Sequence, residues 1–225
     1  HPDSVTFVRS LEEDLMRRDF TINALAVNDK EEIVDYFGGI EDLEREIIRC
    51  VGNPMERFNE DALRMMRAVR FAGQLGFSIE SDTFNAIRTL KANLERVAVE
   101  RMKVEFEKMI LSPHRDLAFK AFVESELYHS CPDFKEAKET LLKLGEFPLE
   151  KMTITQAWIL FAYYERLSIP QLRKVLKNWK SSNDQISTIL TGYQTLLARL
   201  EKEWDAFLAY ECPEVLAIEV EQLLP

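Results

Sequence analysis

The pattern in this sequence best suited to chemistry is a carboxylate followed by guanidiniums at every third position: Asp61, Arg64, Arg67 and Arg70. The apolar residues between them recur with the period of an α-helix, so residues 56–75 are predicted to form one helix that ends at Gly76. At about 100° per residue, this spacing arranges the four side chains as a slanting stripe opposite an apolar face. The stripe leads from an acceptor to a set of fixed donors.

A nucleoside triphosphate offers matching groups at its two ends, a base edge and a polyanion. Cytosine and adenine place an amino donor beside a ring-nitrogen acceptor, whereas uracil and guanine place a carbonyl acceptor beside a ring N–H donor. We expect Asp61 to accept from the amino group and Arg64 to donate to the ring nitrogen. Uracil or guanine would leave buried groups unpaired, at a cost of about 1–3 kcal/mol per site. The stripe therefore predicts a protein template for C and A.

The same spacing also suits a solvated helix face. Glu60 and Arg64, like Arg57 and Asp61, are four residues apart in the sequence. Surface ion pairs at this spacing contribute only about 0.2–0.5 kcal/mol each and occur on many helices. Spacing alone leaves both interpretations open.

A small α+β region is expected to precede a long helical array. Strands are predicted at residues 4–8 and 32–37, and short helices at residues 19–26 and 40–48. Asn53-Pro54 marks a boundary, and only 7 Gly and 8 Pro interrupt the chain. Helices after residue 75 are predicted at residues 81–94, 99–111, 115–128, 134–144, 153–166, 170–179, 183–210 and 213–224. The predicted fold class is mostly α.

Composition limits the partners of the chain. The 225 residues are 46% hydrophobic and carry a formal net charge of -10, so any RNA contact must be local. Basic residues concentrate between Arg17 and Arg115, which favours the front half for binding. Cys50, Cys131 and Cys212 lie far apart, which indicates neither a zinc site nor a disulfide framework and suits a reducing, cytoplasmic setting. No apolar run approaches the roughly 20 residues of a membrane span.

Four sequence elements follow one another between Arg17 and Lys108. They read RRDFTINAL at residues 17–25, DYFGGIEDL at 35–43, RFNEDALRMMRAVRF at 57–71, and VERM with EKM within 99–109. In this order they resemble the motifs of the class II tRNA nucleotidyltransferases (CCA-adding enzymes) and bacterial poly(A) polymerases. The chain is identified as a member of that family by this resemblance.

The resemblance implies a role for each matching residue. Arg18 would contact the triphosphate, Asp19 would lie near the ribose, and the base would be read by Asp61 and Arg64. Two further arginines would complete the nucleotide pocket: Arg67 and Arg70. Structural roles would fall to two glycines in a tight turn and to two residues that brace the base-reading helix: Gly38, Gly39, Glu100 and Arg101.

The family also implies an architecture and a reaction. Residues 1–50 would be the remnant of a nucleotidyltransferase head, residues 51–134 a helical neck with the base template, and residues 135–225 a helical body that binds tRNA. The implied reaction is stepwise transfer of CMP, CMP and AMP from CTP and ATP to the tRNA 3' end. A homodimer is the implied assembly.

The sequence departs from the family at its front. It contains no Gly-Gly before residue 38 and no D-x-D pair, which in the family binds two magnesium ions. It also begins without a methionine and runs directly into patterned sequence. We therefore expect that upstream sequence is missing and that Mg²⁺ is bound by residues outside this chain. The chain itself is expected to hold no catalytic residue and no metal ligand, and to be inactive alone.

Alternative functions share the same observations. A bacterial poly(A) polymerase, or an enzyme that adds only CC or only A, would carry the same four elements. A non-catalytic helical RNA-binding module is the alternative from another class. A basic edge at residues 170–181 suits either the tRNA backbone or a solvated helix face, and the aromatic run at residues 158–164 is expected in the core.

Overall fold

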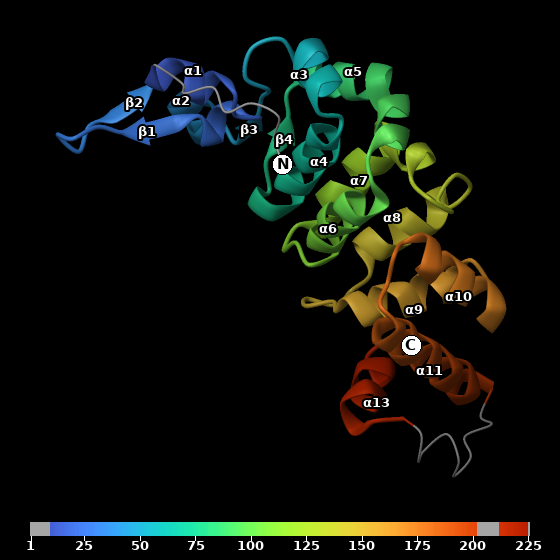
Figure 1. Cartoon of the computed structure of the whole chain (residues 1–225). Coiled ribbons are helices and arrows are strands. Elements are labelled where there is room, and N and C mark those ends of the chain that lie inside the picture. The colour runs from blue at the N-terminus through green and yellow to red at the C-terminus, as the bar shows by residue number, and fades with distance from the viewer. Residues whose placement is uncertain (1–9, 202–211, 225) are drawn as a thin grey trace.

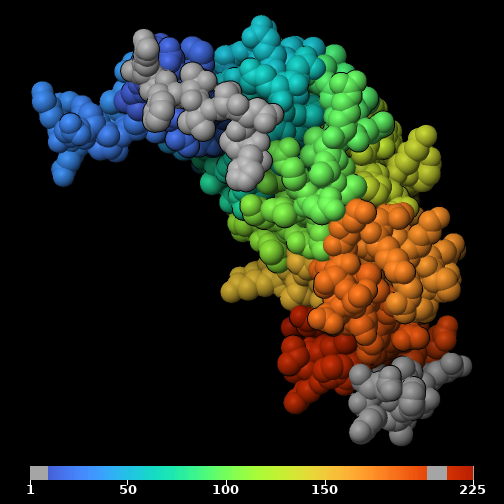
Figure 2. Space-filling model, in the orientation of Figure 1, coloured from blue at the N-terminus to red at the C-terminus, as the bar shows by residue number. Residues whose placement is uncertain are grey.

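The computed structural model describes residues 10–201 and 212–224, which form a curved body with a small α+β lobe at one end and helices along the rest (Figures 1 and 2). The fold is mostly α, as predicted. The strand predicted at residues 4–8 and the end of the helix predicted at residues 183–210 lie outside the described residues. Among the described helices, none combines the length and apolar character needed to cross a membrane.

The small lobe is built from short elements. In chain order they are α1 (Leu11–Met16), the 3-10 turn η1 (Thr21–Asn23), β1 (Leu25–Val27), β2 (Ile33–Asp35) and α2 (Gly39–Glu44). β1 and β2 pair antiparallel, with Leu25 opposite Asp35 and Val27 opposite Ile33. The strand predicted at residues 32–37 is therefore confirmed.

The helix predicted at residues 19–26 is wrong. The Asp19 carboxylate accepts from the backbone N–H of Phe20 at 3.1 Å and from the side-chain amide of Asn23 at 2.6 Å. These bonds close a tight turn instead of starting an α-helix, and Leu25 already belongs to β1. A short polar side chain that bonds its own backbone commonly favours a turn over a helix.

A glycine turn joins β2 to α2. Gly38 has a φ of 75°, and a Cβ on Gly39 would lie 2.2 Å from the carbonyl oxygen of Thr21. The Asp35 carboxylate accepts from the backbone N–H groups of Gly39 and Ile40 at 2.9 Å each. Burial alone would raise the pKa of Asp35, but the backbone donors stabilise the carboxylate and lower that pKa. Both glycines therefore serve the geometry of this turn.

A short parallel pairing joins the lobe to the helices. β3 (Ile47–Ile48) pairs with β4 (Ser78–Ile79), so the helix predicted at residues 40–48 ends early, at Glu44. Glu46 takes a φ of 57° and turns the chain into β3. Strands of two residues have too few positions for a detectable period, which explains why the sequence did not indicate them.

Helices make up the rest of the described chain. They are α3 (Pro54–Glu60), α4 (Leu63–Leu75), α5 (Ser81–Leu90), η2 (Lys91–Arg96), α6 (Val99–Ile110), α7 (Arg115–Glu124), η3 (Leu127–Ser130), α8 (Lys138–Glu146), α9 (Ile154–Tyr164), α10 (Ile169–Asn178), α11 (Asn183–Glu201) and α13 (Glu214–Glu221). Each overlaps a predicted helical range and extends at most two residues beyond it, and the range 56–75 is divided between α3 and α4.

The main apolar core runs from the lobe through the helices, and a second, small cluster lies within the lobe. The centre of the main core is aromatic, with the ring of Phe134 lying 5.0 Å from Phe106 and 4.8 Å from Trp179. Trp158, from the predicted core run at residues 158–164, is 1% exposed and packs on the same cluster. The core prediction is confirmed for residues 158–162, whereas Tyr163 is exposed and Tyr164 is half-buried. Because α4 and α6 are buried along this core, the residues on their outer faces are held on a fixed frame.

Candidate functional site

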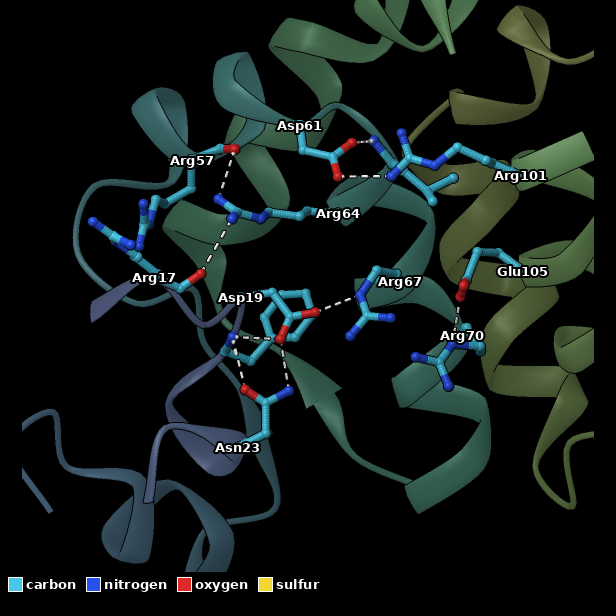
Figure 3. A network of polar contacts seen from close by, with 12 residues as sticks. Arg17, Asp19, Asn23, Arg57, Asp61, Arg64, Arg67, Arg70, Arg101 and Glu105 are labelled. Atoms are coloured by element: carbon cyan, nitrogen blue, oxygen red, sulfur yellow. Dashed lines mark hydrogen bonds and ion pairs between the residues drawn. The ribbon is translucent and has the colours of Figure 1, made fainter. Parts of the chain in front are cut away.

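A cavity of about 360 Å³ opens where the small lobe meets the junction of α3 and α4. The lining residues come from three parts of the chain, around η1, the start of α4 and the start of α6 (Figure 3). They are Arg17, Arg18, Asp19, Asn23, Asp61, Leu63, Arg64, Arg67 and Arg101. Five arginines and two aspartates give the lining an excess of positive charge. Such a cavity favours an anionic ligand.

Asp61 lies at a break between two helices. Its backbone is extended, with φ −146° and ψ 101°, so α3 ends at Glu60 and α4 begins at Leu63. The Oδ1 atom of Asp61 accepts from the backbone N–H of Leu63 at 3.1 Å. The single helix predicted at residues 56–75 is therefore wrong, because an aspartate that bonds a nearby backbone N–H competes with helical geometry. Asp61 therefore lines the cavity because the chain is extended at this break, and not because it belongs to a continuous helical stripe.

The second oxygen of Asp61 is held by another helix. Nη2 of Arg101, in the first turn of α6, lies 2.9 Å from Oδ2 of Asp61. The side chains are 54% and 35% exposed, respectively. The base-reading carboxylate predicted from the sequence therefore carries one donor on each oxygen.

Arg64, on α4, contacts two other segments around the cavity. Its guanidinium donates to the carbonyl oxygens of Arg57 and Arg17, both at 3.2 Å, and to Oε2 of Glu60 at 2.9 Å. Burial would raise the pKa of Glu60, but hydrogen bonds and charge from Arg64 and Arg57 lower it. The pairing of Glu60 with Arg64, which their spacing allows, is confirmed. Asp61, which the same spacing would pair with Arg57, bonds Leu63 and Arg101 instead. The contact with residue 17 ties α4 to the segment that lines the opposite wall.

Arg67 and Asp19 form an ion pair across the cavity. Nε of Arg67 lies 2.5 Å from Oδ2 of Asp19, whose other oxygen accepts from Asn23. The backbone of Asp19 is itself fixed, because its carbonyl oxygen accepts from Val51 N–H at 3.0 Å. The Asp19 side chain is buried and that of Arg67 is 32% exposed. The structure therefore brings together two predicted site residues that are 48 positions apart.

Arg70 lies outside the cavity, in contrast to the sequence prediction. Its Nε is 2.6 Å from Oε2 of Glu105 on α6, and both side chains are buried. The guanidinium also stacks 4.0 Å from the ring centroid of Phe71 and donates to Gln74 at 2.6 Å. Burial lowers the pKa of Arg70, and the charge of Glu105 offsets only part of that effect. Each three-residue step rotates a helical side chain by about 60°, so the third arginine has turned from the cavity toward α6.

The remaining predicted residues take different positions. Arg18 lines the cavity, is 55% exposed and pairs with Asp14 at 3.3 Å. Glu100 is exposed in the first turn of α6, and the residue that joins this helix to α4 is Glu105, which was not among the predicted residues. Arg17 and Asn23 also line the cavity and were not predicted as site residues. Their place inside the RRDFTINAL element was the only available signal.

Residues 1–49 match the family described as "Poly A polymerase head domain", residues 76–138 match "Probable RNA and SrmB- binding site of polymerase A", and residues 149–225 match "tRNA nucleotidyltransferase domain 2 putative". A protein of Enterococcus faecalis named CCA-adding enzyme is 47% identical over 224 residues, which is 99% of this chain and 55% of that protein.

The chain belongs to the tRNA nucleotidyltransferase and poly(A) polymerase family. A CCA-adding enzyme of Pediococcus pentosaceus is 44% identical over 99% of this chain and 57% of its own length. The crystal structure of the Bacillus stearothermophilus CCA-adding enzyme in complex with CTP is 35% identical, with a TM-score of 0.90 over 98% of this chain and 56% of that one. The chain thus spans about half the length of these family members.

Proposed function

We propose that the intact protein is a CCA-adding tRNA nucleotidyltransferase, which transfers CMP, CMP and AMP from CTP and ATP to the tRNA 3' end and releases pyrophosphate. The observation that carries the proposal is the placement of Asp61 and Arg64 together on a positively charged cavity. Its support also comes from relatives that are named CCA-adding enzymes and that match nearly the whole chain.

Both base-reading groups keep free hydrogen-bonding capacity. Each oxygen of Asp61 accepts one hydrogen bond, which leaves further lone pairs for an amino group. Arg64 makes three hydrogen bonds, whereas a guanidinium carries five N–H donors. Asp61 would accept from the amino group of cytosine or adenine, and Arg64 would donate to the adjacent ring nitrogen. A mismatched base would cost about 1–3 kcal/mol.

The other predicted residues would serve the rest of the nucleotide. Arg18 is exposed at the cavity and would contact the triphosphate, while Asp19 would lie near the ribose. Arg67 would keep Asp19 in place and complete the pocket. Arg70 would act on the nucleotide only indirectly, by fixing α4 against α6.

The reaction would use Mg²⁺, whose ligands we place outside this chain. The sequence has no D-x-D pair, and within residues 10–201 and 212–224 no three His, Cys, Asp or Glu side chains group as a metal site would require. Mg²⁺ would therefore be bound by residues outside this chain. We expect the 225-residue chain alone to lack nucleotide transfer.

Partners and division of labour follow from the same proposal. Residues 1–50 would be the remnant of the head, residues 51–134 the neck and residues 135–225 the body that holds tRNA. The four cations of the basic edge lie on α10 or just after it, are exposed and would contact the RNA backbone: Arg173, Lys174, Lys177 and Lys180. The enzyme would act in the cytoplasm as a homodimer.

The decisive experiment uses the intact protein and a tRNA that lacks CCA. The wild type should add C, C and A, and Asp61→Ala should lose the preference for CTP and ATP over UTP and GTP. Asp29→Ala is the matched control, because Asp29 is exposed and is not a lining residue of the cavity. An unchanged preference in Asp61→Ala would overturn the template.

The same assay separates the alternatives. A run of A would identify a poly(A) polymerase, and products that stop after CC, or that need a CC end, would identify a partial enzyme. Binding of tRNA without transfer by the intact protein would favour an RNA-binding module.

A further inference from the structure

Arg101 is unlike the other arginines of the cavity because it comes from α6 and contacts the base-reading carboxylate directly. It donates to Oδ2 of Asp61 at 2.9 Å. The cavity arginines of α4 contact other groups, since Arg64 donates to Glu60 and two carbonyl oxygens and Arg67 pairs with Asp19. The orientation of Asp61 relative to the cavity therefore depends on a residue forty positions away in the sequence.

The position of Arg101 is unfavourable for α6 itself. α6 begins at Val99, and its first turn carries the partial positive charge of a helix N-terminus. A cation at that end is destabilising by up to about 1 kcal/mol. Ala98 adds no side-chain cap that would offset the cost. Arginine at this position thus does not stabilise the helix itself. The interaction that its position allows is the contact with Asp61.

The packing of α6 on α4 has its own ion pair. Arg70 and Glu105 are 2.6 Å apart with side chains 7% and 5% exposed, whereas the Arg101 side chain is 54% exposed. An exposed ion pair contributes about 0–1 kcal/mol to stability. Loss of Arg101 should therefore leave the two helices in place. Its effect falls on the Asp61 carboxylate.

Resting on the proposed function, we propose that Arg101 is a positioning residue that determines base specificity by fixing the orientation of the Asp61 carboxylate. Leu63 N–H holds Oδ1 and Arg101 holds Oδ2, so the plane of the carboxylate is fixed from both sides. Uracil and guanine also carry a ring N–H that a freely rotating carboxylate could accept. To reject these bases, the Asp61 carboxylate must be held in a fixed position relative to the Arg64 guanidinium. Arg101 supplies that constraint.

The test is a double-mutant cycle in the intact protein, with kcat/KM measured for all four nucleotides. Arg101→Gln should lower the selectivity for CTP over UTP, and for ATP over GTP, about five- to tenfold, the net size of one ordinary hydrogen bond. Arg101→Lys should restore part of the loss, because it keeps the charge without the planar fork. In an Asp61→Ala background, Arg101→Gln should change selectivity no further.

Arg96→Gln is the matched control, since Arg96 is an exposed arginine at the end of η2 and is not a lining residue of the cavity. It should leave selectivity unchanged, and all the variants should unfold at nearly the wild-type temperature. The proposal on Arg101 is overturned if Arg101→Gln weakens all four nucleotides equally, or if it lowers selectivity equally with and without Asp61. If Asp61→Ala keeps the wild-type preference, the proposed function fails first and this inference falls with it. If Asp61→Ala abolishes the preference but Arg101→Gln preserves it, the inference on Arg101 alone fails.

Discussion

Replacing Glu105 with leucine should destabilise the protein strongly, because the substitution leaves the Arg70 guanidinium buried without an anion. Arg70 is 6% exposed, and its Nε lies 2.6 Å from the Glu105 carboxylate. An arginine does not shed its proton at accessible pH, so the charge stays buried. Removal of one partner of a buried ion pair typically costs about 3–5 kcal/mol. The hydrogen bond to Gln74 and the ring of Phe71 remain, which places our expectation near the lower value.

The double variant Arg70→Met with Glu105→Leu should be much more stable than Glu105→Leu alone. Two apolar side chains of similar volume require no desolvation of charge, and such exchanges are often neutral or stabilising. We expect the double variant to lie within about 1.5 kcal/mol of the wild type, the usual range for well-tolerated core exchanges. The difference between single and double variants measures the cost of the unpaired charge.

Urea unfolding followed by tryptophan fluorescence provides the assay, because Trp158 and Trp179 are buried in the shared core. A shift in the midpoint at constant slope reports a change in stability. Affinity for CTP should be nearly unchanged in the double variant, because Arg70 does not line the cavity. The reasoning is refuted if Glu105→Leu costs less than about 1 kcal/mol, or if the double variant is as unstable as the sum of its parts. A large loss of CTP affinity in a stable double variant would show that Arg70 does contribute to the nucleotide pocket.

Three further predictions concern other parts of the chain. Gly39→Ala should destabilise the small lobe by about 1–3 kcal/mol, seen as faster hydrogen exchange there, because the new Cβ would meet the Thr21 carbonyl oxygen at 2.2 Å; normal exchange would contradict it. Burial raises the pKa of Cys50 to about 12, so at pH 8 the thiol should stay protonated and resist alkylation until the protein is denatured, which peptide mapping would reveal. Replacing Lys174 and Lys177 with glutamine should reduce the slope of log affinity for tRNA against log salt by about 2; an unchanged slope would exclude contact at α10.

Much of the fold was accessible from the sequence because long helices repeat their apolar period many times. α9, for example, begins with a capping box in which Thr153 accepts from Gln156 N–H and Gln156 accepts from Thr153 N–H. Such signals are local and predict helix starts well. The short strands were missed because β3 and β4 depend on each other across thirty residues of chain.

The candidate site could be predicted only in part. The periodicity of residues 56–75 placed Arg64 and Arg67 correctly on one side of a helix, but the extended backbone at Asp61 follows from a side-chain hydrogen bond that no periodicity reports. Arg70 was misplaced because the sequence spacing of three residues is the same at every step, whereas in a helix each step rotates the side chain by about 60° from the previous one. The ion-pair partner that holds Arg70 away from the cavity, Glu105, lies on a different helix.

The pairing of β3 with β4 makes the break at Asp61, between α3 and α4, part of a closed loop of chain. Residues 49–77 leave the lobe, form α3 and α4, and return to the lobe's own strand. A cut or a graft at residue 50 would open this loop and also detach Val51 N–H from the carbonyl oxygen of Asp19. In chimaeras that exchange the lobe between relatives, the junction should therefore lie after residue 79. Each lobe is then transferred together with α3 and α4.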